Sequence, residues 1–101
     1  MMETKRQYLN RTFMYWGSVV ISALTQQYEQ EENYEMCELL TSVIRNKNKR
    51  FGLSDGGLPT RYSEEIVRRE FKSSPNKGDV VIRNMPYYIR DLRDAIEALP
   101  D

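Results

Sequence analysis

Apolar residues recur at the helical period through the first third of the chain. Over residues 8 to 28 one appears every three or four positions, which is the repeat of one face of an α-helix. The members of this stripe are Leu9, Phe13, Trp16, Val20, Leu24 and Tyr28. A second apolar line, Met14, Val19 and Ile21, lies off the stripe, so the predicted helix is apolar on more than one side. Gly17 lowers its stability by about 1 kcal/mol relative to alanine and would allow another helix to cross closely.

A second helix is predicted over residues 34 to 48, after a turn near Glu32 and with Asn33 as its N-cap. Glutamates occupy its first turn and cations its end, as the helix dipole favours. Its apolar face consists of Met36, Cys37, Leu40, Val43 and Ile44. The first two helices therefore form a hairpin.

The second half of the chain predicts two shorter helices separated by connectors. Residues 51–60, FGLSDGGLPT, have turn composition, and Gly52 is the residue expected to end the second helix in the left-handed conformation. Ser63 is the predicted N-cap of a third helix. It buries Ile66, Val67 and Phe71.

The last helix is predicted to begin at Pro86, because proline suits the first turn. Its apolar positions are Ile89, Leu92, Ile96 and Leu99. The run VVI at 80–82 has strand composition, so a short extended segment is an alternative there and would need a partner strand. The pattern as a whole predicts one all-α domain over residues 1–101, a small bundle of about four helices.

One segment of the predicted hairpin, EENYEMCELLTSVI at residues 31–44, carries a recognisable pattern of acidic residue, Asn, Tyr and Glu, followed by a small residue, a Leu and an Ile. It resembles the UVR motif, a helical hairpin of excision-repair proteins and of some stress regulators. The matching positions are Glu32, Asn33, Tyr34, Glu35, Cys37, Leu40 and Ile44. The resemblance implies a hairpin turn at Glu32–Asn33 and a role in pairing one protein with another.

Composition narrows the classes of function. Of the 101 residues, 40% are hydrophobic and 30% charged, which is typical of one folded domain. Fifteen basic and fifteen acidic residues cancel, so net charge favours neither nucleic acid nor an anionic membrane. The least polar run, FMYWGSVVISAL, is shorter than the about 20 residues that span a bilayer, and the following TQQYEQ offers no small-x-small signal cleavage site. We therefore expect buried protein and no membrane partner.

Catalytic chemistry has few candidate groups in this chain. There is no histidine, the commonest general base and metal ligand at neutral pH. The one cysteine, Cys37, cannot form an intrachain disulfide, so nothing indicates an oxidising compartment. The sequence predicts a cytoplasmic protein that is not an enzyme and has no catalytic, metal or cofactor site.

The first hypothesis for function is a non-catalytic interaction protein that acts by stoichiometric binding. A helix that is apolar on more than one side needs cover from a second copy or a larger partner, so we expect a homo-oligomer, and an adaptor, a regulator or an inhibitor of the kind that phages and mobile elements carry. The candidate contact residues lie off the main stripe or are tyrosines and an arginine suited to interfaces, namely Met14, Ile21, Arg61, Tyr62, Tyr87 and Tyr88.

The alternative is an accessory nucleic-acid-binding protein. The segment RNKNKRF at 45–51 places four cations within six positions and an aromatic residue directly after them. These side chains would contact phosphates and stack on a base; they are Arg45, Lys47, Lys49, Arg50 and Phe51. The same run also fits a helix C-terminus, which favours cations, with Phe51 folded back on the core.

Overall fold

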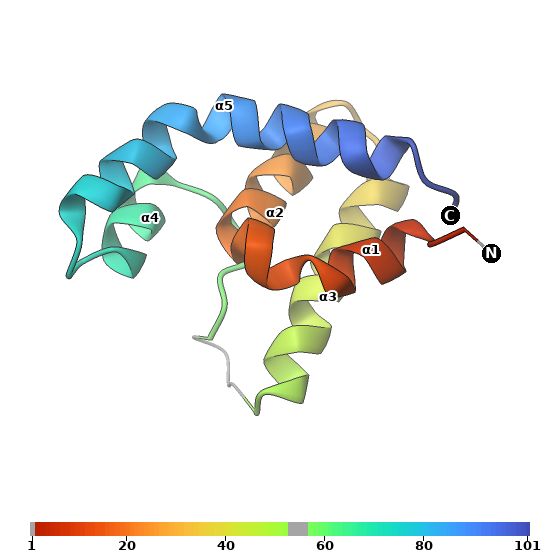
Figure 1. The fold of residues 1–101 in the computed structure, drawn as a ribbon, viewed down its shortest axis with the longest axis horizontal. Helices are drawn as coiled ribbons and strands as arrows, with labels where there is room; N and C mark the ends of the chain where they lie inside the picture. Colours follow the sequence, from red (N-terminus) through yellow and green to blue (C-terminus); the bar gives the residue numbers. More distant parts are fainter. Residues whose placement is uncertain (1, 53–56) are drawn as a thin grey trace.

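The computed structural model describes residues 2–52 and 57–101, and these form an all-α bundle with no strand. Figure 1 shows the last helix lying across the others. The predicted fold class is confirmed, although the described residues form five helices rather than four. They are α1 (Lys5–Arg11), α2 (Phe13–Gln30), α3 (Tyr34–Arg50), α4 (Glu64–Glu70) and α5 (Pro75–Glu97).

The long N-terminal helix predicted over residues 8 to 28 is broken twice. α1 ends at Arg11, and α2 contains a kink at Gly17, whose backbone has φ 84° and ψ 155°. Residues that carry a Cβ almost never adopt this pair of backbone angles, so the kink depends on glycine. The prediction of one continuous helix is therefore wrong. The apolar residues keep their helical spacing across Gly17, although the backbone at Gly17 is not helical.

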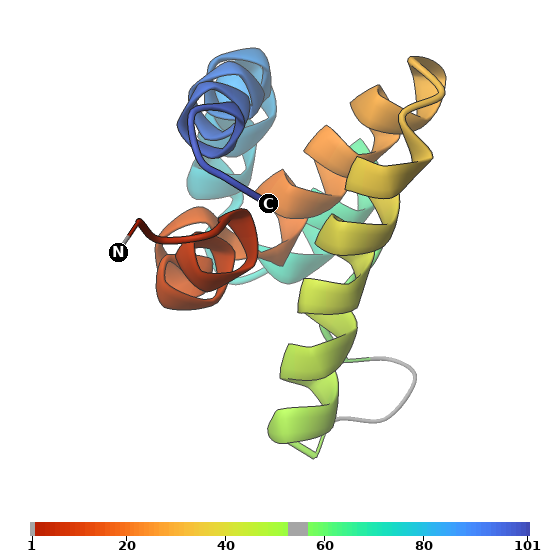
Figure 2. The same ribbon diagram turned by 90° about the vertical axis from the view of Figure 1, so that its right-hand side faces the viewer.

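The start of α1 contacts the C-terminal end of the chain. Thr4 and Gln7 form a capping box at its start. The backbone N–H of Lys5 donates to the carbonyl of Pro100 at 2.9 Å, and the Lys5 ammonium lies 3.3 Å from Asp101. The two ends of the chain consequently lie at the same end of the molecule, which is on the right in Figure 1 and faces the viewer in Figure 2.

α2 is the central helix and is enclosed by α3, α5 and the connection that precedes α4. Residues 18 to 25 are all buried except Val19, which is half-buried. The Ser22 hydroxyl lies 2.6 Å from the Ser18 carbonyl and 3.1 Å from the Pro59 carbonyl, which fixes the connection against the helix. Of the second apolar line, the chain therefore buries Ile21 fully and Val19 in part, whereas Met14 stays exposed.

The turn between α2 and α3 has the geometry that the sequence predicted. The Asn33 side chain accepts a hydrogen bond from the Met36 backbone at 3.3 Å, so it caps α3. Glu32 takes φ 60°, and the Asn33 N–H donates to the Tyr28 carbonyl at 2.8 Å. The predicted hairpin turn at Glu32–Asn33 is confirmed.

An ion-pair network attaches this hairpin to α5. The Arg93 guanidinium lies 2.6 and 2.7 Å from the two Glu31 carboxylate oxygens and 2.9 Å from Glu97. It also lies 4.7 Å from the Tyr28 ring centroid, and the Tyr28 hydroxyl donates to Glu97 at 2.8 Å. Because Tyr28 is fully buried, the network secures a core side chain as well as the surface.

The C-terminal half corrects two predictions and confirms two. Ser63 caps α4 through a hydrogen bond from the Ile66 backbone, as predicted, and Gly52 has the left-handed φ of 68°. The remainder of the predicted turn, residues 53–56, lies outside the described residues.

The extended segment at 80–82 and the helix start at Pro86 are both wrong, because α5 is helical from Pro75 through this whole stretch. β-branched residues lower helix stability by only a few tenths of a kcal/mol, and packing of Val81 against the core outweighs that cost. Pro86 lies inside α5 and is exposed; α5 is bent along its length (Figure 1), as an internal proline produces.

Candidate functional site

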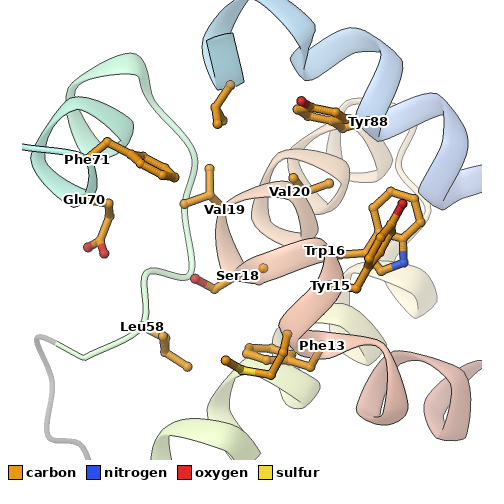
Figure 3. A pocket seen from close by; sticks show the side chains of 13 residues that line it. Phe13, Tyr15, Trp16, Ser18, Val19, Val20, Leu58, Glu70, Phe71 and Tyr88 are labelled. Carbon is orange, nitrogen blue, oxygen red and sulfur yellow. The ribbon is translucent and has the colours of Figure 1, made fainter. Parts of the chain in front are cut away.

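An open apolar groove of about 610 Å³ lies where the first turns of α2 meet α4 and α5 (Figure 3). Residues 13 to 20 of α2 form one wall. The opposite wall and the floor come from the connection before α4, the end of α4 and α5, and consist of Leu58, Glu70, Phe71, Val81 and Tyr88. Among the lining residues only Glu70 carries a charge.

The kink at Gly17 shapes this groove. It gives the turn formed by residues 13 to 16 a direction different from that of the rest of α2. A Cβ at Gly17 would meet no atom within 4 Å, so the backbone itself is open to the groove. The wall formed by residues 13 to 20 is therefore an irregular turn whose direction depends on Gly17.

Aromatic contacts hold that turn in place. The Trp16 indole N–H lies 3.2 Å from the Tyr8 hydroxyl, which accepts its hydrogen bond. The Tyr15 ring meets the Trp16 ring edge to face, with centroids 4.9 Å apart. Phe13 is buried and has the Lys47 ammonium 5.6 Å from its ring centroid. The wall is thus rigid on its inner side.

Two large side chains of the same turn are exposed. Met14 is 84% exposed and Tyr15 is 80% exposed, although neighbouring Phe13 belongs to the core. Exposed apolar residues beside a concave apolar surface are typical of a binding site. The groove and these two side chains together are the candidate site.

The structure brings together only part of the predicted contact set. Met14 and Tyr88 both line the groove, whereas Tyr62 packs half-buried on the core. Tyr87 is exposed and stacks with Arg90, away from the groove lining.

Ile21 is fully buried in the single chain and is a core residue rather than a contact residue. The reason is the kink at Gly17, after which α3, α5 and the connection enclose α2. Sequence reasoning missed Tyr15, Val19, Leu58, Phe71 and Val81, since helical periodicity does not show which distant segments meet.

Arg61 and Arg45, predicted for two different functions, line the same polar pocket of about 380 Å³ between α2, α3 and the connection before α4. Both side chains are exposed. Glu29 and three threonines share the pocket, so its charge is mixed. This position separates Arg45 from the other cations of the basic run.

The rest of the basic run forms the end of α3, which projects below the bundle in Figures 1 and 2. Lys49 and Arg50 are exposed, and Phe51 is 55% exposed. The reading in which Phe51 folds back on the core is therefore wrong. Within the part of the chain that the structure describes, Lys47, Lys49 and Arg50 form no ion pair with a carboxylate.

The thiol of Cys37, the one cysteine of the chain, is held in its neutral form. The Cys37 thiol is half-buried and donates to the Thr25 carbonyl at 3.4 Å. Burial, together with the nearby Glu29 carboxylate, raises the pKa of the Cys37 thiol, so it is protonated at neutral pH. Across residues 2–52 and 57–101, no three acidic or cysteine side chains come close enough to hold a metal ion.

No protein-family model, no curated protein and no solved structure matches this chain. Among the described helices, none is long and apolar enough to cross a membrane. A functional proposal therefore depends on the groove and on the exposed end of α3.

Proposed function

We propose that this protein is a non-catalytic interaction protein that acts by stoichiometric binding of another protein in the groove. The observation that carries the proposal is the exposure of Met14 and Tyr15 at the edge of an apolar groove. Full burial of a methionine side chain contributes about 1.5–3 kcal/mol, and tyrosine and tryptophan are frequent centres of binding energy. The edge of the groove holds all three residue types.

Preorganisation supports the same proposal. Trp16 is held by the Tyr8 hydroxyl and by the Tyr15 ring, so binding would order few additional groups at this wall. Met14 has an unbranched side chain that adapts to the shape of a partner. A rigid aromatic wall beside an adaptable methionine suits the apolar face of a partner helix.

We place the protein among adaptors, regulators and the stoichiometric inhibitors that phages and mobile elements carry, because such proteins act by contact alone. The resemblance of residues 31–44 to the UVR motif, which implies pairing between proteins, supports this class. A cytoplasmic location is part of the proposal, since a lone reduced thiol is usual in a reducing compartment.

The test is site-specific photo-crosslinking in the native cell. Replacing Met14 with p-benzoylphenylalanine should yield a discrete crosslinked product of defined mass. The matched control carries the same group at Asp94, which is exposed on α5 outside the groove lining and should yield no such product. Equal crosslinking from both positions, or none from Met14, would contradict the proposal.

The second candidate function is binding of nucleic acid by the end of α3. The observation that favours it is the exposure of Phe51 beside Lys49 and Arg50 on a projecting helix end. Cations there would contact phosphates and the ring would stack on a base. Anisotropy of labelled single-stranded DNA and RNA over a salt series tests it. Binding that weakens with salt and is lost when Lys47, Lys49 and Arg50 become alanine supports it; salt-independent or absent binding refutes it.

A further inference from the structure

The polar pocket between α2, α3 and the connection before α4 is a second hollow, separate from the apolar groove. Its volume is about 380 Å³, within the roughly 300–1,000 Å³ of small-molecule sites, and it shares no lining residue with the groove. Two arginines, one glutamate, two glutamines and three threonines line it. Because apolar ligand surface finds no apolar side chain there to pack against, the pocket suits a ligand that is polar throughout.

Helical spacing brings the polar groups of two helices to this pocket. Thr25 and Glu29 are four positions apart on α2, and Thr41 and Arg45 are four positions apart on α3, so each pair lies on one face of its helix. α2 and α3 pack side by side after the hairpin turn (Figure 2), and both faces border the same hollow. Arg61 reaches it from the connection before α4.

Hydrogen bonds from both helices fix the backbone that carries Arg61. The Asn48 side chain on α3 accepts from the Leu58 N–H at 2.8 Å and donates to the Leu58 carbonyl at 3.2 Å. The Ser22 hydroxyl on α2 lies 3.1 Å from the carbonyl of the next residue, Pro59. The connection is thus anchored directly before it enters the pocket, so a ligand held by Arg61 would order little additional backbone.

The charged side chains of the pocket face it without pairing with one another. Neither Arg45 nor Arg61 forms an ion pair with a described carboxylate, although Glu29 lines the same hollow. Two guanidinium groups match a phosphate monoester, which carries about −1.5 to −2 charges and three acceptor oxygens. The Glu29 carboxylate accepts hydrogen bonds and repels anions, so it favours hydroxyl donors on the rest of the ligand.

From these observations we propose that the pocket binds a small phosphorylated polyol of the sugar-phosphate class. Arg45 and Arg61 hold the phosphate, and Glu29 and the threonine hydroxyls bind the hydroxyl groups. No aromatic side chain lines the pocket, so a nucleobase would find no ring on which to stack. This site goes beyond the proposed function and does not depend on it, because the groove uses other residues.

Titration of the isotope-labelled full chain with glucose 6-phosphate, followed by backbone amide NMR in a chloride buffer, tests the proposal. The signals of residues 25–30, 41–45, 60 and 61 should shift. Glucose, gluconate and inorganic phosphate each lack the phosphate or the hydroxyls and should bind about tenfold more weakly or worse. Binding of any of these three as tightly as glucose 6-phosphate overturns the proposal, and so does tighter binding of a phosphoserine peptide.

Substitutions locate the site. Arg45→Ala and Arg61→Ala should each weaken glucose 6-phosphate binding by about tenfold or more, since each removes charge-assisted hydrogen bonds. Arg83→Ala is the matched control, because Arg83 is exposed on α5 outside the pocket lining, and it should leave the affinity unchanged. Circular dichroism checks that the variants fold, as the exposure of all three arginines leads us to expect.

Glu29→Gln tests the hydroxyl end of the ligand. It should reduce the preference for glucose 6-phosphate over inorganic phosphate, because it removes both an acceptor for hydroxyls and a repulsion of anions. An unchanged preference overturns the assignment of the polyol, as an unchanged affinity in both arginine variants, or no binding by the wild type, overturns the site. Crosslinking from Met14 is independent of all these results, so the proposed function stands or falls separately.

Discussion

Replacing Gly17 with alanine distinguishes the kinked α2 from the continuous helix that periodicity predicts. The backbone at Gly17, φ 84° and ψ 155°, belongs to a region that is essentially restricted to glycine, and a strained residue there costs about 1–3 kcal/mol. A Cβ at this position meets no atom within 4 Å, so no steric contact adds to the cost.

The expected change follows from two opposing effects. Alanine also restricts the unfolded chain, which offsets about 0.4–1 kcal/mol of the strain. The free energy of unfolding should therefore fall by about 1–2 kcal/mol in Gly17→Ala. For a domain of this size the Tm should fall by about 4–8 °C per kcal/mol. A continuous helix predicts the opposite sign, because alanine is favoured over glycine inside a helix by about 1 kcal/mol.

Thermal and urea unfolding followed by circular dichroism measures the effect. Gly52 supplies the matched control, since its φ of 68° is also positive and it too has open space around it. Asparagine is accepted in the left-handed conformation, so Gly52→Asn should be well tolerated, whereas Gly17→Asn should destabilise as alanine does. A Gly17→Ala variant as stable as the wild type, or more so, would refute the kink and with it the shape of the groove.

Three further predictions concern the core, a cap and an ion pair. Ile21→Ala should lower the free energy of unfolding by about 2–5 kcal/mol, without the change in oligomeric state that a surface residue would give; sedimentation and urea unfolding measure the two effects separately. Ser63→Ala should cost about 1 kcal/mol in the same unfolding assay, because it removes the side-chain cap of α4, and an unchanged midpoint would exclude that role. The hydrogen-bonded Arg93 lowers the pKa of Glu31 below its ordinary 4.5, so the stability from this pair is present above that value and is lost as the pH falls through the lowered pKa. Urea midpoints between pH 6 and pH 3 should consequently fall less in Glu31→Gln than in the wild type, and equal slopes would show that the pair contributes nothing.

The features that the sequence predicted well are those that a few neighbouring residues determine. Asn33 and Ser63 cap their helices by hydrogen bonds to backbone groups three residues away, and Gly52 ends α3 through its own conformation. Such local signals need no knowledge of the rest of the fold.

The features that were mispredicted depend on tertiary packing. Ser74 and Pro75 begin α5 and provide an N-terminal signal as good as the one attributed to Pro86. In the helical stretch Val81 packs against the core, a contact that the local sequence does not show. The kink at Gly17 likewise carries no local signal beyond glycine itself.

The groove could not be predicted from the sequence, for a related reason. Its walls come from residues 13 to 20 and from Leu58, Phe71, Val81 and Tyr88, which are far apart along the chain. Met14 was identified because it lies off the main apolar stripe, and Tyr88 because tyrosine suits interfaces. Their placement on one surface requires the fold.

The hydrogen bond between the Lys5 amide and the Pro100 carbonyl holds the two ends of the chain side by side. A short peptide joining the ends would need to span little distance, as circular permutation requires. The domain should likewise tolerate insertion into a surface loop of a host protein, since both attachment points would leave from the same place.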